Sequence, residues 1–136
     1  MKTMAERYRE LQLALPAEPQ YLAQVRRLVR TLALDAGASN IQADDMVLAV
    51  NEACSNVAVH AYGENGGPLH VHAWEEPGRV VFEVSDNGTP VADPTASAGA
   101  GLGLHLINKV CDDVDIEGPG PYGTRLEMTF FLATVR

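Results

Sequence analysis

The stretch NEACSNVAVHAY, residues 51–62, combines the composition of a buried helix with a regular row of polar side chains. Its apolar residues are mostly small, and Glu52, Asn56 and His60 recur at intervals of four residues. In an α-helix this interval places the three side chains above one another on a single face. The sequence therefore predicts a helix that packs against a core and presents a carboxylate, an amide and an imidazole along one side.

The size and composition around this helix predict one globular domain over residues 1–136. The chain has 136 residues, of which 46% are hydrophobic. A chain of this length buries roughly two-thirds of its unfolded surface, which is enough for a core.

The charge balance narrows the class of partner. Ten Lys and Arg residues oppose eighteen Asp and Glu residues, for a formal net charge of −8. An acidic chain without a basic run argues against nucleic acid or an anionic membrane as the direct partner. A phosphorylated ligand would have to be bound locally, by backbone donors, a metal ion or a few well-placed cations.

The cysteines and the hydropathy favour a cytoplasmic protein without a structural metal. Cys54 and Cys111 form no CxxC pair, so we expect two reduced thiols and neither structural zinc nor a disulfide framework. No apolar run approaches the ~18 residues of a membrane span. The first ten residues, MKTMAERYRE, lack the apolar region of a signal peptide.

The hydrophobic periodicity predicts an α+β fold. Ser39 and Asn40 offer a cap for the helix of the opening stretch. Around that helix the patterns predict further helices at 18–36 and 102–113, and strands at 9–15, 69–76, 79–86, 114–118 and 124–135, with loops at 63–67, 87–101 and 118–123. This order predicts a two-layer α/β sandwich in which three helices cover one face of a mixed sheet.

A glycine-rich segment precedes the last predicted helix. Asp86 and Gly88 end a strand, and Gly99, Gly101 and Gly103 lead into the helix. Free amides at a helix start, together with the helix dipole, favour an anion such as a phosphate chain. The segment is not a Walker loop, because no GK[ST] follows, and it lacks the context of a dinucleotide fingerprint. Taken alone, it is equally consistent with a glycine-rich connector.

Four motifs in this order resemble the Bergerat-type ATP-binding fold that histidine kinases, type II topoisomerases and Hsp90-like chaperones share. More narrowly, AVNEACSNVAVHAY is similar to the helix motif of the anti-sigma-factor serine kinase family. The four motifs are Glu52/Asn56, Asp86-x-Gly88, Gly99-x-Gly101-x-Gly103 and Gly123-Thr124. The resemblance covers essentially the whole chain and implies ATP and Mg²⁺ as ligands.

The resemblance also implies roles for individual residues. Asn56 matches the magnesium ligand. Glu52 matches the catalytic carboxylate, which would accept the proton of a serine hydroxyl on a partner protein. Asp86 matches the acceptor of the adenine amino group, and Gly88 the glycine that lets the base approach the backbone. Thr124 matches the residue whose hydroxyl supports Asp86.

The phosphate loop, which doubles as a lid in the family, matches Gly99, Gly101, Leu102 and Gly103. Two departures from the family pattern stand near it. Pro90 stands where the wider superfamily usually has a second glycine, which the serine-kinase branch often lacks. No Lys or Arg lies between Arg79 and Lys109. The lid therefore carries no cation that could neutralise transition-state charge.

Arg26, Arg27 and Arg30 offer two interpretations, a solvated helix face or a docking patch for an acidic protein surface. The family docks partners partly through this region. His60 is interpreted as a structural histidine.

The leading functional hypothesis is an ATP-dependent serine-protein kinase that acts as an anti-sigma factor. The resemblance implies that it sequesters a sigma factor and phosphorylates a serine of an anti-sigma antagonist. Many members of the family form homodimers, so a homodimer is possible here as well. The alternative is a non-catalytic ATP-binding module that controls a protein partner by nucleotide occupancy. A histidine-kinase catalytic domain is disfavoured because we expect no phosphoacceptor hairpin in 136 residues. A plain ATPase is disfavoured because nothing couples hydrolysis to motion.

Overall fold

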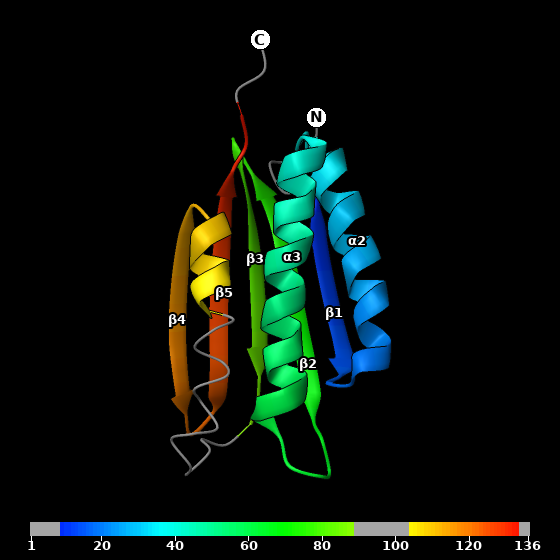
Figure 1. Ribbon diagram of the computed structural model, residues 1–136, viewed down its shortest axis with the longest axis vertical. Helices are drawn as coiled ribbons and strands as arrows, with labels where there is room; N and C mark the ends of the chain where they lie inside the picture. Colours follow the sequence, from blue (N-terminus) through cyan, green and yellow to red (C-terminus); the bar gives the residue numbers. More distant parts are fainter. Residues whose placement is uncertain (1–8, 89–103, 134–136) are drawn as a thin grey trace, which may run out of the picture.

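The computed structural model describes residues 9–88 and 104–133 and contains one five-stranded sheet. The strands are β1 (Glu10–Pro16), β2 (Pro68–Glu76), β3 (Arg79–Asp86), β4 (Asp113–Gly120) and β5 (Gly123–Phe131). Their order across the sheet is β1-β2-β3-β5-β4 (Figure 1). The fold is therefore α+β, as the sequence predicted.

The sheet is antiparallel between all neighbours, so the prediction of a mixed sheet was wrong. β3 and β4 do run in the same direction, because each pairs antiparallel with β5. A helical crossover between them is the connection that parallel strands require. The tight turn after Gly120, however, returns the chain as β5, which occupies the place between β3 and β4.

Three helices cover one face of this sheet (Figure 1). They are α2 (Leu22–Asp35), which follows the 3₁₀ turn η1 (Pro19–Tyr21), α3 (Asn40–Asn56) and the helical residues 104–110. Val25 and Val29 of α2 are fully buried against the sheet core, where the rings of Phe82 and Phe130 meet edge to face at 5.9 Å. None of the helices in residues 9–88 and 104–133 is long and apolar enough to cross a membrane.

The small side chains of α3 explain how a helix with a polar row fits beside the core. Its buried positions include Ala43, Ala49, Ala53 and Cys54, so little side-chain volume separates its backbone from the neighbouring layer. Close packing of this kind makes the position of the helix sensitive to single methyl groups. The polar residues of α3 are thereby held at a defined height above the sheet.

The N-terminus of α3 is fixed by a capping box. Ser39 Oγ accepts from the backbone N–H of Gln42 at 3.1 Å, and Gln42 Oε1 accepts from the backbone N–H of Ser39 at 3.1 Å. The Gln42 amide also donates to the carbonyl of Phe131 at 3.0 Å, which joins the helix start to the end of β5. The predicted cap at Ser39 is thus confirmed.

Several predicted boundaries were wrong at the ends of elements. The helix predicted at 102–113 ends at residue 110, and the strand predicted at 124–135 ends at Phe131. α3 does not continue as an α-helix to Tyr62: it gives way to a π-helical turn, η2 (Val57–Ala61), and Tyr62 has extended backbone. The loop predicted at 118–123 is mostly strand. Gly118 adopts a φ of 95°, and a register shift between Glu117 and Gly120 lets β4 continue to a turn at residues 121–122.

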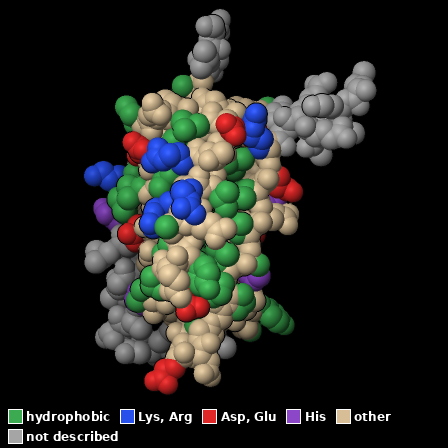
Figure 2. Space-filling model, turned by 90° about the vertical axis from the view of Figure 1, so that its right-hand side faces the viewer, with side chains coloured by type: hydrophobic (Ala, Val, Ile, Leu, Met, Phe, Trp, Pro, Cys, Tyr) green, Lys and Arg blue, Asp and Glu red, His purple; other side chains and the backbone are tan. Residues whose placement is uncertain are grey.

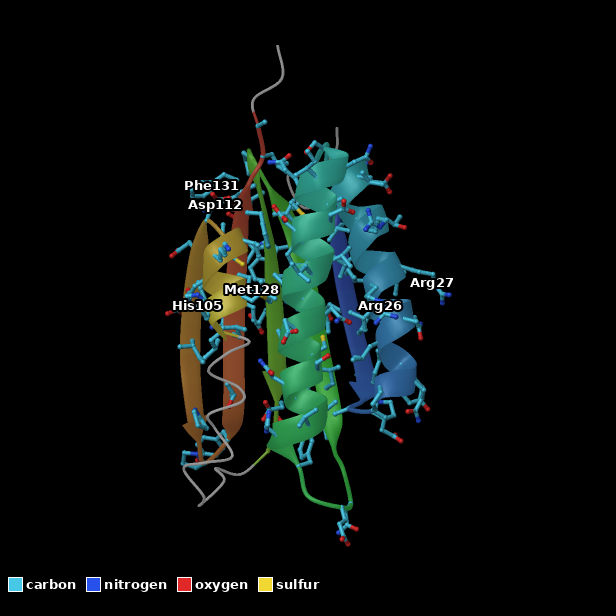
Figure 3. The ribbon with its side chains drawn as sticks, in the orientation of Figure 1. Arg26, Arg27, His105, Asp112, Met128 and Phe131 are labelled. Carbon is cyan, nitrogen blue, oxygen red and sulfur yellow. The ribbon has the colours of Figure 1, made fainter. Side chains whose placement is uncertain are left out.

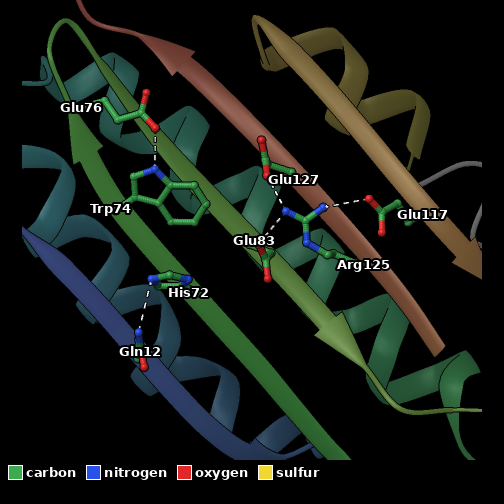
Figure 4. A network of polar contacts seen from close by, with 8 residues as sticks. All are labelled: Gln12, His72, Trp74, Glu76, Glu83, Glu117, Arg125 and Glu127. Atoms are coloured by element: carbon green, nitrogen blue, oxygen red, sulfur yellow. Dashed lines mark hydrogen bonds and ion pairs between the residues drawn. The ribbon is translucent and has the colours of Figure 1, made fainter. Parts of the chain in front are cut away.

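The other face of the sheet carries polar side chains and Trp74 (Figure 4). Arg125 lies there between Glu83 at 2.8 Å, Glu127 at 2.7 Å and Glu117 at 3.5 Å. Hydrogen bonds and charge from Glu83, and then from Glu127, raise the pKa of Arg125 above its usual value. The guanidinium is committed to this face, away from the helices.

Replacing Ser39 by alanine should destabilise the protein by about 1 kcal/mol, because the backbone N–H of Gln42 loses the Ser39 hydroxyl that accepts its hydrogen bond. Urea unfolding measures the change. Ser39→Asp is the matched control and should remain near the wild-type stability, because aspartate also caps helices. Equal stability of the alanine variant and the wild type would contradict a stabilising cap.

Candidate functional site

The candidate site lies where the C-terminal end of α3 and η2 meets the end of β3 and the start of β5. Asp86 is the last residue of β3 and is buried, with 6% of its surface exposed. It lies directly opposite Thr124 of β5. Side chains of directly opposed residues in an antiparallel pair share one face, so the Thr124 hydroxyl projects on the same side as the carboxylate. This arrangement is consistent with the predicted support of Asp86 by Thr124.

Gly88 permits a contact that no other residue would allow. Its backbone N–H donates to Asp86 Oδ1 at 2.9 Å, which holds one carboxylate oxygen toward the chain that follows β3. A Cβ at Gly88 would lie 2.1 Å from the carbonyl oxygen of Ala61. The end of β3 therefore packs backbone to backbone against the last residue of η2.

Gly123 permits a second contact of this kind and was not among the predicted site residues. Its φ is 102°, and a Cβ there would lie 2.0 Å from the carbonyl oxygen of Asp86. The sequence offered a signal, because Gly123 directly precedes Thr124 in the fourth motif. Only the paired strands show that Gly123 contacts the backbone of Asp86.

Glu52 and Asn56 are half-buried on α3, and Asn56 is its last residue. Glu52 takes part in none of the ion pairs between described residues. The Asn56 side chain makes no capping hydrogen bond to η2. An amide oxygen and a carboxylate one turn apart, both reachable from solvent, are chemically suited to bind Mg²⁺ and to accept a proton. His60 is half-buried within η2.

The predicted phosphate-loop residues Gly99, Gly101, Leu102 and Gly103 lie outside the described residues, as does Pro90. The predicted site residues within the described part of the chain are Glu52, Asn56, Asp86, Gly88 and Thr124. The fold brings the last three together at one end of the sheet. The first two lie on the helix whose continuation contacts Gly88.

Cys54 lies on the buried side of the same helix and is not a nucleophile. Burial raises the pKa of its thiol to about 12, so the sulfur is protonated at neutral pH. Burial also raises the pKa of Cys111 to about 12, with the charges of Asp112 and Asp45 acting in the same direction. Both cysteines are free, as the sequence predicted.

The arginines of α2 are mostly engaged within the fold. The Arg26 guanidinium donates to Asn51 Oδ1 at 2.9 Å, and Arg30 pairs with Asp44 at 2.7 Å, so both join α2 to α3. Arg27 extends away from α3 (Figure 3). Basic side chains gather on the α2 side of the molecule (Figure 2), and structural contacts account for two of the three.

Tyr62 joins three segments at the site and was not predicted. Its hydroxyl donates to the carbonyl of Pro68 at the start of β2 and accepts from the backbone N–H of Asn87 at 2.8 Å. Its ring lies over Gly67, where a Cβ would come within 2.3 Å of a ring carbon. Its place at the end of the opening stretch was the only sequence signal, because both hydrogen-bond partners are backbone groups, which no side-chain pattern marks.

A hollow of about 530 Å³ lies beside this junction, between the end of β1 and the loop at 63–67. Its lining includes Leu15, Glu64 and Gly67 but none of the predicted site residues. The hollow lies away from the candidate site residues, so we assign it no role.

The chain is similar to known ATP-binding proteins and protein kinases. Residues 15–130 match the family model of the histidine kinase-like ATPase domain. The serine-protein kinases RsbW of Bacillus thuringiensis, Bacillus cereus and Bacillus anthracis are each 30% identical over 128 residues, covering 83% of this chain and 80% of theirs.

A solved structure supports the fold. The crystal structure of the RsbU and RsbW domains of a Mycobacterium tuberculosis protein superposes with a TM-score of 0.74 at 24% identity. The match covers 91% of this chain and 32% of that longer chain, so the present chain spans about a third of it.

Replacing Gly123 by alanine should destabilise the protein by roughly 2–3 kcal/mol, because the new methyl group meets the Asp86 carbonyl and the backbone has a positive φ. Gly120→Ala is the matched control from the same hairpin, since a Cβ there meets nothing within 4 Å. Urea unfolding of both variants measures the difference. Similar stability of the two would show that the close approach of Gly123 to Asp86 is not a constraint.

Proposed function

Because the chain belongs to the histidine kinase-like ATPase family, and within it to the anti-sigma-factor serine-protein kinases, we propose that it transfers phosphate from ATP to a serine of an anti-sigma antagonist. The observation that carries the proposal is the junction itself. One helix presents Glu52 and Asn56, and its continuation packs on the segment that contains Asp86 and Gly88. The proposed proton acceptor, metal ligand and purine-binding carboxylate would thereby belong to one connected part of the fold.

The proposed adenine contact uses the oxygen of Asp86 that Gly88 leaves unoccupied. One oxygen, Oδ1, accepts from the Gly88 backbone, and the other can accept from the exocyclic amino group of adenine. Guanine and hypoxanthine carry a carbonyl at that position, so a buried carboxylate would face another acceptor. A buried acceptor without a donor costs about 1–3 kcal/mol, which is the source of the proposed base selectivity.

Asn56 would hold Mg²⁺ through its amide oxygen, with phosphate oxygens and water as further ligands. The bound ion would offset the negative charge of the phosphate chain. The residue fits this role because its side chain lies at the end of α3, is partly exposed and caps neither α3 nor η2. Arg26 and Arg30 are held by Asn51 and Asp44, and Arg27 extends away from α3 (Figure 3). Arg125 pairs with glutamates on the other face of the sheet. Charge neutralisation would therefore rest on the metal and on backbone amides.

In the proposed transfer Glu52 accepts the proton from the serine hydroxyl of the antagonist. The serine oxygen forms a bond to the γ-phosphorus, and the bond from that phosphorus to the bridging oxygen of ADP breaks. Phosphoserine and ADP are the products, and the proton resides on Glu52. One helical turn separates Glu52 from Asn56, so the proton acceptor and the metal ligand face the same phosphate.

The proposed biological setting is a partner switch. The protein would sequester a sigma factor when the antagonist is phosphorylated and release it when the unmodified antagonist competes. Support comes from the similarity to RsbW serine-protein kinases. The competing proposal, regulation by ATP occupancy without transfer, is favoured by the absence of Lys and Arg between Arg79 and Lys109 in the sequence.

Replacing Glu52 by glutamine should preserve ATP binding and reduce phosphate transfer by about 10²–10⁴-fold, because glutamine cannot accept the serine proton. Transfer of labelled γ-phosphate to a serine-bearing antagonist from the same genome measures the effect. Glu64→Gln, in the exposed loop at 63–67, is the matched control and should transfer at the wild-type rate. Transfer at the wild-type rate by Glu52→Gln would exclude Glu52 as the base. ATP binding without transfer by the wild type would favour occupancy control.

Replacing Asn56 by alanine should remove the dependence of ATP affinity on Mg²⁺, because the proposed protein ligand of the ion is lost. Calorimetry with and without Mg²⁺ measures both affinities. Asn65→Ala, in an exposed loop, is the control and should retain the magnesium dependence. Unchanged dependence in Asn56→Ala would place the ion elsewhere.

A further inference from the structure

Tyr62 contacts the candidate site but takes no part in the proposed mechanism. It is the residue at which η2 ends, and its backbone is extended with φ −128° and ψ 155°. The preceding π-helical turn is a rare conformation that commonly marks functional positions. Here it separates the helix that carries Glu52 and Asn56 from a tyrosine directed at the base-binding segment.

The hydroxyl of Tyr62 is fully used, once as donor and once as acceptor. It donates to the carbonyl of Pro68 and accepts from the N–H of Asn87. Burial, and to a lesser extent the charge of Asp86, raise the pKa of the phenol, so it is protonated at neutral pH and able to donate. A phenylalanine could occupy the same space but would make neither hydrogen bond.

The acceptor side of this bridge contacts the proposed base-binding segment. Asn87 lies between Asp86, whose carboxylate would read the adenine amino group, and Gly88, whose backbone lies against Ala61. The Asn87 N–H is held by Tyr62, and the Gly88 N–H is held by Asp86 Oδ1. Two consecutive peptide groups after Asp86 thus have fixed directions, and the first depends on the tyrosine.

The donor side ties the same hydroxyl to the sheet. Pro68 begins β2, and the Tyr62 ring lies over Gly67, whose carbonyl accepts from the N–H of Ala17 at 2.9 Å. The ring therefore rests on a part of the backbone that is anchored to the end of β1. Glycine is required at residue 67 because a side chain there would displace the ring.

We propose that Tyr62 is a positioning residue for base selection: it joins the helix of Glu52 and Asn56 to the Asp86–Gly88 segment and so sets the carboxylate at the height of the adenine amino group. The inference rests on the proposed function. It adds that selectivity for adenine depends on a hydroxyl that does not touch the nucleotide. It also explains why the helix motif extends to Tyr62, beyond its last polar side chain on the Glu52 face.

The test compares the affinities of ATP and inosine triphosphate, which carries a carbonyl in place of the adenine amino group. Calorimetry with Mg²⁺ measures both for the wild type and for Tyr62→Phe. We expect the wild type to prefer ATP. The phenylalanine variant should bind ATP about tenfold more weakly and lose less affinity for inosine triphosphate, so the selectivity ratio falls.

Three further variants make the test specific. Tyr122→Phe removes a hydroxyl from a tyrosine that is 91% exposed, and it should keep the wild-type ratio. Asp86→Asn replaces one carboxylate oxygen by an NH2 donor, which would face the adenine amino group but suit the carbonyl of inosine triphosphate, and should lower the ratio at least as far as Tyr62→Phe. Gly67→Ala displaces the Tyr62 ring without removing the hydroxyl and should lower the ratio by an independent route, even if Tyr62→Phe folds poorly.

The possible failures are distinguishable. If the wild type binds neither nucleotide, or binds both equally, the proposed function is wrong and the role of Tyr62 falls with it. If the wild type prefers ATP and Tyr62→Phe keeps the full preference, only the role of Tyr62 is wrong. Equal losses of affinity for both nucleotides would also overturn the proposal, because a purely structural role weakens binding without changing base selection.

Discussion

The close packing of backbone on backbone at the end of β3 is the constraint on which the candidate site depends. Gly88 lies against the carbonyl of Ala61 on one side, and Gly123 lies against the carbonyl of Asp86 on the other. Protein interiors are packed densely enough that a single methyl group at either contact would require the backbone to move. The position of the Asp86 carboxylate therefore depends on the close backbone contacts that Gly88 and Gly123 permit, and on the hydrogen bond that it accepts from the Gly88 N–H.

The same close packing helps to fix the position of α3 relative to the sheet. α3 carries Glu52 and Asn56, is capped at Ser39 and is tied at its start to the end of β5 through Gln42. Small buried residues let it lie close to the sheet, and η2 brings its far end onto the segment after β3. Both ends of the helical segment thus contact the same sheet. The proposed proton acceptor and metal ligand on such a helix would keep a defined distance from the proposed base-binding carboxylate, which would preorganise a site for the proposed phosphoryl transfer.

Much of the fold followed from local patterns, and the errors occurred where local patterns compete with tertiary contacts. The period-2 alternation of residues 79–86 predicted β3 with its exact bounds, and the Ser39 cap was predicted because its partners lie three residues away. The antiparallel arrangement was missed because the insertion of β5 between β3 and β4 depends on long-range pairing. The loop predicted at 118–123 failed because Gly118 and Pro119 indicate turns locally but form part of a bulged strand.

The sequence by itself determined which chemical groups are available and which share an element. The four-residue interval puts Glu52 and Asn56 on one helical face in any fold that keeps the helix, and the order of the motifs indicated the family. The tertiary structure alone decided which backbone groups meet. The contacts of Gly123 with Asp86 and of Tyr62 with Asn87 join residues far apart in the chain, and each reaches a main-chain group of its partner. Such contacts leave no mark on the side-chain pattern, because their specificity lies in position and not in residue type.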